Sequence, residues 1–167
     1  MQWIYEKNEN NSARFVLGQI NDVTGRTLLC FGVNPGMATP ECLDPTIEKV
    51  KKISKYNGYD NRIMLNLYPQ RVTDPNGLHL ERDACLVKAN LLHIKKTAEH
   101  FADCDVLLAY GNLISKRKYL KICLSEIIEL LNGEQKKKIK IIKLTKKNNP
   151  VHPLYQKNNS TLIEFII

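Results

Sequence analysis

Four runs of apolar residues, three of them ended by glycine, asparagine or proline, divide the chain into strand-like segments. The runs cover residues 27–33, 62–69, 105–112 and 139–144. A short run that is apolar at nearly every position is typical of a strand covered on both faces, as in a parallel sheet. The fourth run alternates lysine with isoleucine, which predicts a strand at the edge of that sheet.

Segments with helical spacing separate these runs. Asp44 precedes a proline and a stripe of apolar residues, which predicts a capped helix that ends at Asn57-Gly58. Asp83 is predicted to cap a second helix and Ser115 a third, which Gly133 ends. Strands that alternate with helices and are joined by right-handed crossovers predict a three-layer α/β/α fold built on a four-stranded parallel sheet.

Two short apolar segments precede the first of these strands. Trp3–Tyr5 and Arg14–Leu17 are separated by an asparagine-rich stretch, which predicts an N-terminal hairpin beside the sheet. A length of 167 residues fits one domain, so we expect residues 1–167 to fold as a single unit.

Composition narrows the class of protein. Apolar residues make up 43% of the chain and charged residues 25%, which is typical of a globular protein. No apolar run is long enough to span a membrane, and the N-terminus has no apolar signal core, so a cytoplasmic location is expected. The five cysteines are widely spaced and odd in number, which predicts neither disulfides nor a metal site. Four are expected in the core; Cys42, in a loop, is the exception. No cofactor is predicted.

The net charge of +8 lies entirely in the second half of the chain. Residues 1–83 hold 10 basic and 10 acidic side chains, and residues 84–167 hold 15 basic and 7 acidic ones. Such an imbalance favours an acidic partner, with nucleic acid or a nucleotide first, although a solvated lysine-rich face would give the same count. His93 and His100 lie seven positions apart on the second predicted helix and are expected at its surface.

Polar residues and tyrosines follow each of the four predicted parallel strands. The carboxyl ends of parallel strands share one edge of a sheet, and that edge is the usual ligand site of open α/β folds. Amides can read the edge of a planar heterocycle, tyrosine can stack on its face, and histidine can stabilise charge on a ring oxygen. The residues expected there are Asn34, Pro35, Gly36, Asn66, Tyr68, Tyr110, Asn112, His152, Leu154 and Tyr155.

Each of these residues also has a purely structural alternative. Asn34 is a common turn residue, and His152 stands between Val151 and Pro153, where it can brace a loop. Tyr68 and Tyr110 follow apolar runs and can pack in the core. The expectation of a ligand site therefore depends on all of them meeting at one edge.

Several of these motifs resemble a catalogued family. Asn34-Pro35, Asp44-Pro45-Thr46, Asn66-Leu67, Tyr110-Gly111 and His152-Pro153-Leu154-Tyr155 look like the family catalogued as domain of unknown function 1643. The resemblance extends from about residue 15 to residue 155 and brings no assigned activity.

The order of motifs more distantly resembles the uracil-DNA glycosylase superfamily. Residues 32–36, Gly-Val-Asn-Pro-Gly, are similar to the Gly-x-Asn-Pro-Gly motif of its mismatch-specific members. Leu65-Asn66 resembles the strand whose asparagine reads uracil, and residues 107–111 resemble the Leu-Leu-Trp-Gly strand that follows. His152-Pro153 resembles the start of the His-Pro-Ser-Pro motif, but Leu154-Tyr155 replaces its last two residues.

The resemblance to glycosylases implies a role for each matching residue. Asn34 would position the attacking water, Asn66 would read the base, and His152 would hold charge on the departing base. Leu154 would wedge the duplex, and the N–H groups of Gly36 and Met37 would face a phosphate.

The chain also departs from the glycosylase pattern. No carboxylate replaces Asn34 as a general base, although Asp44, which otherwise only caps a helix, is a candidate for that role.

Contacts from Lys146 and Lys147 to phosphates would offset the cost of flipping a base out of a duplex.

Three functions stay open on the sequence alone. The first is cleavage of an N-glycosidic bond in nucleic acid or a nucleoside, which the motif order favours. The second is binding of a nucleotide or modified base without chemistry, which the missing carboxylate favours. The third is a basic interaction protein with no small-molecule site, which the lysine content alone would explain.

Overall fold

A computed structural model describes all residues, 1–167, as an α/β fold around one seven-stranded mixed sheet. The strands are β1 (Gln2–Lys7), β2 (Arg14–Ile20), β3 (Thr27–Gly32), β4 (Asn61–Asn66), β5 (Asp105–Leu108), β6 (Ile139–Ile141) and β7 (Ile163–Glu164). Their order across the sheet is β1-β2-β4-β3-β5-β6-β7.

The centre of the sheet is parallel, as the apolar runs predict. β3 pairs in parallel with β4 on one side and with β5 on the other, and β5 pairs in parallel with β6. β1 and β2 form the predicted N-terminal hairpin, and β2 extends the sheet by pairing antiparallel with β4.

The fourth parallel strand is not an edge. β7 pairs antiparallel with β6, so the prediction of an edge strand there is wrong. Lys140, which suggested the edge, lies 4.0 Å from the carboxylate of Asp105 on β5 and is largely covered. β7 has only two residues, which is too few to show a strand period in the sequence.

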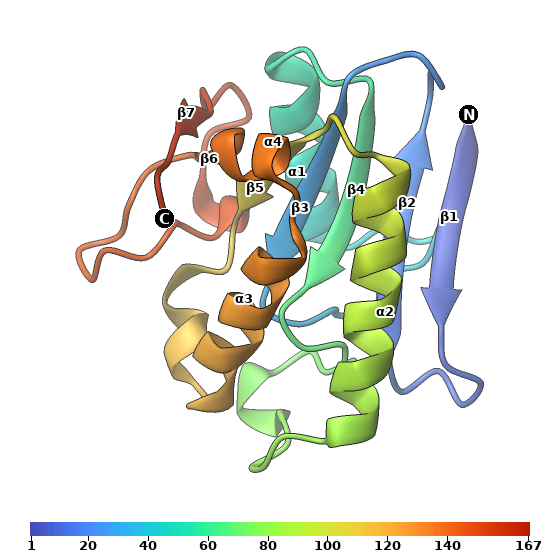
Figure 1. Cartoon of the computed structure of the whole chain (residues 1–167), viewed down its shortest axis with the longest axis vertical. Helices are drawn as coiled ribbons and strands as arrows, with labels where there is room; N and C mark the ends of the chain where they lie inside the picture. The colour runs from blue at the N-terminus through green and yellow to red at the C-terminus, as the bar shows by residue number, and fades with distance from the viewer.

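Four α-helices and three short 3₁₀ helices cover the sheet. The α-helices are α1 (Pro45–Tyr56), α2 (Ala84–His100), α3 (Tyr119–Leu130) and α4 (Gly133–Lys137), and the 3₁₀ helices are η1 (Pro75–Gly77), η2 (Gly111–Ser115) and η3 (Pro153–Tyr155). In Figure 1, α2 and α3 lie in front of the sheet and α1 lies behind it, which gives three layers. No helix is both long and apolar enough to cross a membrane.

The caps of α1 and α2 are those that the sequence predicts. An oxygen of Asp44 accepts from the Ile47 N–H at 2.8 Å, and one of Asp83 accepts from the Leu86 N–H at 2.9 Å. The boundaries of α3 differ from the prediction, since Ser115 ends η2 and α3 begins at Tyr119. Gly133 begins α4 after a capping box at Asn132, where the prediction ended α3.

Two apolar cores lie on opposite faces of the sheet. Alternate residues of β3 divide between them: Leu29 and Phe31 pack under α2 and α3, whereas Leu28 and Cys30 pack under α1. Cys85 is exposed, so the expectation that it lies in the core is wrong. His93 is not a free surface residue either, because its ring stacks on Phe15 at 4.5 Å between centroids.

Candidate functional site at the ends of the parallel strands

The connections between the parallel strands reverse direction at β3. The chain leaves β3 through α1 to reach β4 on one side, and later returns through α2 to reach β5 on the other side. Loops that leave neighbouring strand ends toward opposite faces diverge, and ligands of open α/β sheets bind at that point. Here that point lies between the segments that follow Gly32 and Leu108.

Asn66, Asp44 and His152 come to this edge on the α1 side of the sheet. Asn66 continues the alternation of Met64, which packs under α1. Asp44 caps α1, and η3, which directly follows His152, packs against α1. We call Asn34, Gly36, Asp44, Asn66 and His152 the rim cluster.

Close approaches between side chains and glycines place three members of the rim cluster. A Cβ built on Gly36 would lie 3.1 Å from an oxygen of Asp44, and one built on Gly32 would lie 3.1 Å from Oδ1 of Asn66. Gly111 has a φ of +59° and would bring a Cβ to 3.1 Å from the Cβ of His152. Each of these side chains therefore lies against the end of β3 or β5.

His152 is held as a hydrogen-bond donor. Its Nδ1 accepts from the Leu154 N–H at 3.3 Å, which assigns the ring proton of the neutral imidazole to Nε2. Burial lowers the pKa of His152, and the nearby carboxylate of Asp44 opposes that shift. Asp44 and His152 are thus close enough to act on each other's charge.

Asn66 brings a buried amide group with free hydrogen-bonding capacity. Its side chain is 2% exposed, and its Nδ2 has no partner within the chain. A buried donor without a partner costs about 1–3 kcal/mol. Asn90 of α2 fixes the backbone beneath it, since its Nδ2 donates to the Asn66 carbonyl at 2.9 Å.

Asn34 already uses part of its hydrogen-bonding capacity within the chain. The Nδ2 of Asn34 donates to the carbonyls of Pro35 and Val72 at 3.1 and 2.9 Å, so only its oxygen is available to a ligand or water. Pro35 is buried and Met37 is exposed. The N–H groups of Gly36 and Met37 donate to no backbone group of the chain.

The two tyrosines expected to stack on a ligand lie elsewhere. Tyr68 is fully buried on the α2 side, where its hydroxyl contacts Nδ1 of His79 at 2.7 Å and accepts from the Asp83 N–H. Tyr110 is buried in the same core, and burial raises its pKa. Both rings therefore pack in the core that lies under α2 and α3.

Of the remaining predicted residues, Asn112, Lys146 and Lys147 lie at the turn that follows β6, and Leu154 and Tyr155 lie on η3. Asn112 is exposed and accepts hydrogen bonds from Thr145 and Asn149 at 2.8 and 2.9 Å, so it braces that turn. Lys146 and Lys147 project from the turn into solvent. Leu154 is half-buried and Tyr155 is 86% exposed, which leaves Tyr155 free to meet a partner.

Two cavities of the molecule lie away from the rim cluster. One of about 420 Å³ is lined by α4 and the C-terminal residues, and one of about 280 Å³ lies between the N-terminal hairpin and α2. No three His, Cys, Asp or Glu side chains come together as they would to hold a metal ion.

Sequence reasoning missed two residues beside the rim cluster. Arg14 and Arg71 are buried, and their guanidinium groups hold the turn from Gly36 to Ala38 by its carbonyls. Arg14 opens an apolar strand-like run, which is an unusual place for a charged side chain. A charged residue at the start of an apolar run is the feature of the sequence that could have indicated the role of Arg14.

The fold and the rim cluster define an α/β protein with polar groups gathered where its strand order reverses. The chain belongs to the family described as "Protein of unknown function (DUF1643)", which residues 14–154 match. The matched segment contains every member of the rim cluster and Arg14. No curated protein matches the chain.

Proposed function

We propose that the rim cluster recognises a nucleobase and that the protein cleaves the N-glycosidic bond of a nucleoside, nucleotide or nucleic acid. The observation that carries the proposal is that Asp44 and His152, which belong to distant motifs, lie against Gly36 and Gly111 after the neighbouring strands β3 and β5, where the carboxylate is near enough to act on the pKa of the imidazole. A carboxylate and a neutral imidazole in mutual range are a common acid–base pair of hydrolases.

His152 suits the role of stabilising the leaving base. Its neutral ring presents Nε2–H as a donor, and burial keeps the ring neutral. A donor already in place where negative charge develops lowers the barrier, because no reorganisation is needed during the reaction. The base oxygen would accept this hydrogen bond as the glycosidic bond breaks.

Asp44 and Asn34 suit activation of water. The water oxygen forms a bond to C1′ of the sugar while the bond from C1′ to the base nitrogen breaks, and its electron pair leaves with the base. Asp44 takes the proton of the water and returns it to the base nitrogen. The free oxygen of Asn34 would accept from the same water and orient it.

Asn66 suits recognition of the base. Its buried Nδ2 has no partner, and a heterocycle with a carbonyl at its edge would provide one. A site whose polar groups stay unpaired without the correct ligand discriminates strongly against the wrong one.

The resemblance of Gly32–Gly36, Asn66 and His152-Pro153 to motifs of uracil-DNA glycosylases supports the same assignment of roles. Two features of the chain differ from those enzymes. Leu154-Tyr155 stands in place of the serine and proline that follow the histidine, and Asp44 belongs to a motif that the glycosylases lack. Both differences favour a substrate other than uracil in duplex DNA.

A non-catalytic nucleotide-binding role is the second candidate. It is favoured by the side chain of Asn34, whose amide is already bound to the carbonyls of Pro35 and Val72. A binder of this kind would be stabilised by its ligand against heat and would leave the ligand intact.

Base release measured by mass spectrometry tests the enzymatic proposal. Nucleosides, nucleotides and oligonucleotides with normal, deaminated and alkylated bases form the panel. We expect Asp44→Asn and His152→Gln to lower the rate at least about 100-fold, as loss of acid–base groups does. Asn is as good a cap as Asp, so the Asp44→Asn variant should keep its stability.

Matched variants control for the helix cap and for the loss of a histidine. Asp83→Asn changes the other capping aspartate, and His100→Gln changes an exposed histidine of α2. Both should retain wild-type rates. Intact substrates across the whole panel, or equal loss in all four variants, would contradict an enzymatic role for the rim cluster.

A further inference from the structure

The two edges of the sheet differ in how much backbone they leave open. β7 forms one edge with two residues, whereas β1 forms the other with six. The backbone of β1 bonds to β2, and no loop of the protein donates to it or accepts from it on the other side. In Figure 1, β1 stands outermost and no helix lies beyond it. An open edge strand of this length is a template for pairing with another chain.

β1 also lacks the features that normally protect an edge strand. It contains no proline, and the residues at its middle, Trp3–Tyr5, carry no charge. Its pairing with β2 is regular from Gln2 to Glu6, and the one shift in register falls between Glu6 and Lys7, at the end of the strand. A proline, a bulge or a charge at the middle of an edge strand hinders a further strand, and β1 has none of these there.

The regular part of β1 is complementary to itself. Its five residues have Ile4 at their centre, so a two-fold axis at Ile4 pairs all five with those of a second copy in antiparallel register. Trp3 then lies opposite the second copy's Tyr5, and Gln2 lies opposite its Glu6. Residues directly opposite each other share a face of the sheet, so this register sets aromatic against aromatic and polar against polar, with no like charges opposed.

The next register along the strand is less favourable. A two-fold axis at Tyr5 sets Ile4 opposite the second copy's Glu6, and it sets Trp3 opposite Lys7, where the ladder is no longer regular. An axis halfway between two residues would oppose side chains that point to different faces, which a β-ladder does not allow. Ile4 is therefore the favoured centre.

The side chains around this centre are only partly covered. Trp3 and Tyr5 are half-buried and pack beside the core under α1. On the other face, Ile4 is half-buried at the groove of about 280 Å³ between the hairpin and α2. Glu6 and Lys96 both line that groove, so it holds charges of both signs. Pairing of two such edges covers apolar surface on both faces of the sheet and opposes no excess of one charge.

We propose that the protein forms a two-fold dimer in which β1 pairs antiparallel with β1 of a second copy about Ile4, so that the two sheets become one. The dimer does not depend on the proposed function of the rim cluster. Five paired residues extend over about 17 Å, and an interface of that length is at the small end of specific interfaces. The dimer should therefore be weak and should dissociate on dilution.

Sedimentation over a range of protein concentrations tests the dimer. The mass should rise from that of one chain below about 1 μM to that of two chains above about 1 mM. Trp3 is the one tryptophan of the chain, and its emission should shift to shorter wavelength over the same range, because the second copy's Tyr5 covers it. A mass of one chain throughout would overturn the proposal and leave the edge of β1 to a different protein.

Substitutions of Gln2 test the register without disturbing the fold, because this side chain is exposed. Gln2→Glu opposes a carboxylate to the second copy's Glu6 at two symmetric places and should raise the dissociation constant about tenfold. Gln2→Lys opposes unlike charges at the same places and should lower the constant about tenfold. The double variant Gln2→Glu/Glu6→Gln exchanges the members of the pair, so its constant should return to within about threefold of the wild type.

Ser125→Glu and Ser125→Lys are the matched controls, since they make the same charge changes at an exposed position of α3. Both should leave the dissociation constant of the wild type unchanged. Equal effects of Gln2→Glu and Gln2→Lys, or a double variant as weak as Gln2→Glu alone, would overturn pairing about Ile4. A dimer that no β1 variant affects would use another surface and would likewise overturn the proposal.

Discussion

Asp44 shows how one residue serves the fold and the candidate chemistry together. One oxygen caps α1 through the Ile47 N–H, and another lies against Gly36. Its charge acts on His152 and on Arg14, which stand on different elements. The sequence pattern predicts the cap, because capping is local, but it does not predict that Asp44 lies near Arg14, because that proximity depends on how the hairpin docks.

The pH dependence of stability should report the environment of His152. Burial lowers its pKa below the ordinary value of 6.5, so the unfolded chain binds this proton more readily than the folded one. Above about pH 6.5 the ring is neutral in the folded and the unfolded chain, so it costs no stability. As the pH falls toward the pKa of the folded protein, the unfolded chain takes up the proton first and the free energy of unfolding decreases. Urea unfolding at about pH 7.5 and about pH 5.5 should show a smaller loss in His152→Gln than in the wild type.

His100→Gln is the control for this measurement. His100 is exposed on α2, so its replacement controls for the loss of one histidine outside the rim cluster. His93 is also buried enough to lower its pKa, and it accounts for the part of the acid loss that persists in His152→Gln. An identical acid loss in the wild type and in His152→Gln would contradict the buried placement of His152.

Among the candidate residues, those placed well by sequence reasoning belong to strand ends and helix caps. Asn66, Asp44 and His152 reach the predicted edge, since the edge follows from parallel strand order. Tyr68 and Tyr110 follow the same strands but turn into the other core. The chain leaves strand geometry at these positions, so alternation no longer tells which face a side chain takes.

At the scale of elements, α2 fixes the end of β4 through one side chain. Asn90 is 1% exposed, and its Nδ2 donates to the carbonyls of Asn66 and Leu67 at 2.9 and 3.5 Å. Its own oxygen has no partner. The helix on one face of the sheet thereby positions the backbone of a rim residue whose side chain lies on the other face.

Replacing Asn90 should therefore disturb ligand response more than stability. Asn90→Ala removes the bond to Asn66, but it also removes an oxygen without a partner, so we expect a loss of only about 1–2 kcal/mol in the free energy of unfolding. The apparent affinity for the preferred nucleotide, measured from its stabilisation of the protein against heat, should fall at least about tenfold, because Asn66 is no longer held.

Lys88→Ala, on the exposed side of α2, is the control for Asn90→Ala. Its free energy of unfolding should stay within about 0.5 kcal/mol of the wild type, with an unchanged nucleotide response. A normal nucleotide response in Asn90→Ala would show that α2 does not position Asn66.

The sequence predicts where a helix begins and ends less well than it predicts the presence of a strand. The apolar runs predict all four parallel strands because each is buried on both faces. Ser115 resembles a helix cap in the sequence, yet it is the last residue of η2 (Gly111–Ser115), whose first residue donates its N–H to the Pro150 carbonyl at 2.8 Å. Such a long-range bond leaves no local trace in the sequence.

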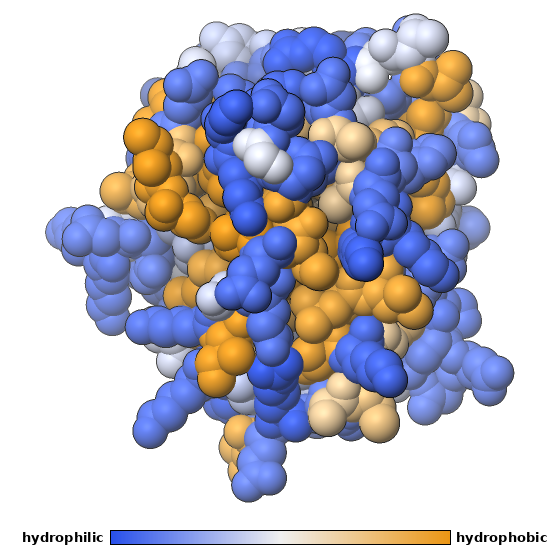
Figure 2. All heavy atoms as spheres, in the orientation of Figure 1, coloured by the Kyte–Doolittle hydropathy of each residue, from blue (hydrophilic) through white to orange (hydrophobic).

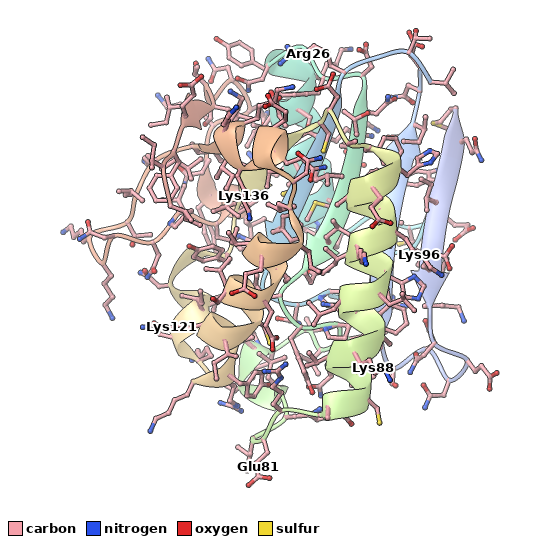
Figure 3. All side chains as sticks on the ribbon, in the orientation of Figure 1. Arg26, Glu81, Lys88, Lys96, Lys121 and Lys136 are labelled. Atoms are coloured by element: carbon pink, nitrogen blue, oxygen red, sulfur yellow. The ribbon has the colours of Figure 1, made fainter.

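At the scale of the whole molecule, much of the positive charge lies away from the rim cluster. Lys88 and Lys96 on α2 and Lys121 on α3 project from the face of the sheet opposite α1 (Figure 3). On that face, polar side chains stand out around an exposed apolar strip (Figure 2). Mutations on this basic face should therefore change any binding of nucleic acid without changing the binding of a nucleotide at the rim cluster.

A triple charge reversal on the basic face tests that separation. Lys88→Glu, Lys96→Glu and Lys121→Glu together should abolish salt-sensitive retention of DNA, measured as the slope of log affinity against log salt. The nucleotide-induced rise in melting temperature should not change. Loss of both properties together would contradict two independent surfaces, and retention of DNA binding would contradict a role for this face.

A structure of the protein crystallised with the common nucleoside 5′-monophosphates tests the central claim most directly. We predict one nucleotide with its base between Asn66 and His152 and its C1′ near Asp44. A nucleotide bound at another place, or side chains that close the ends of β3 and β5 over one another with no nucleotide between them, would contradict it.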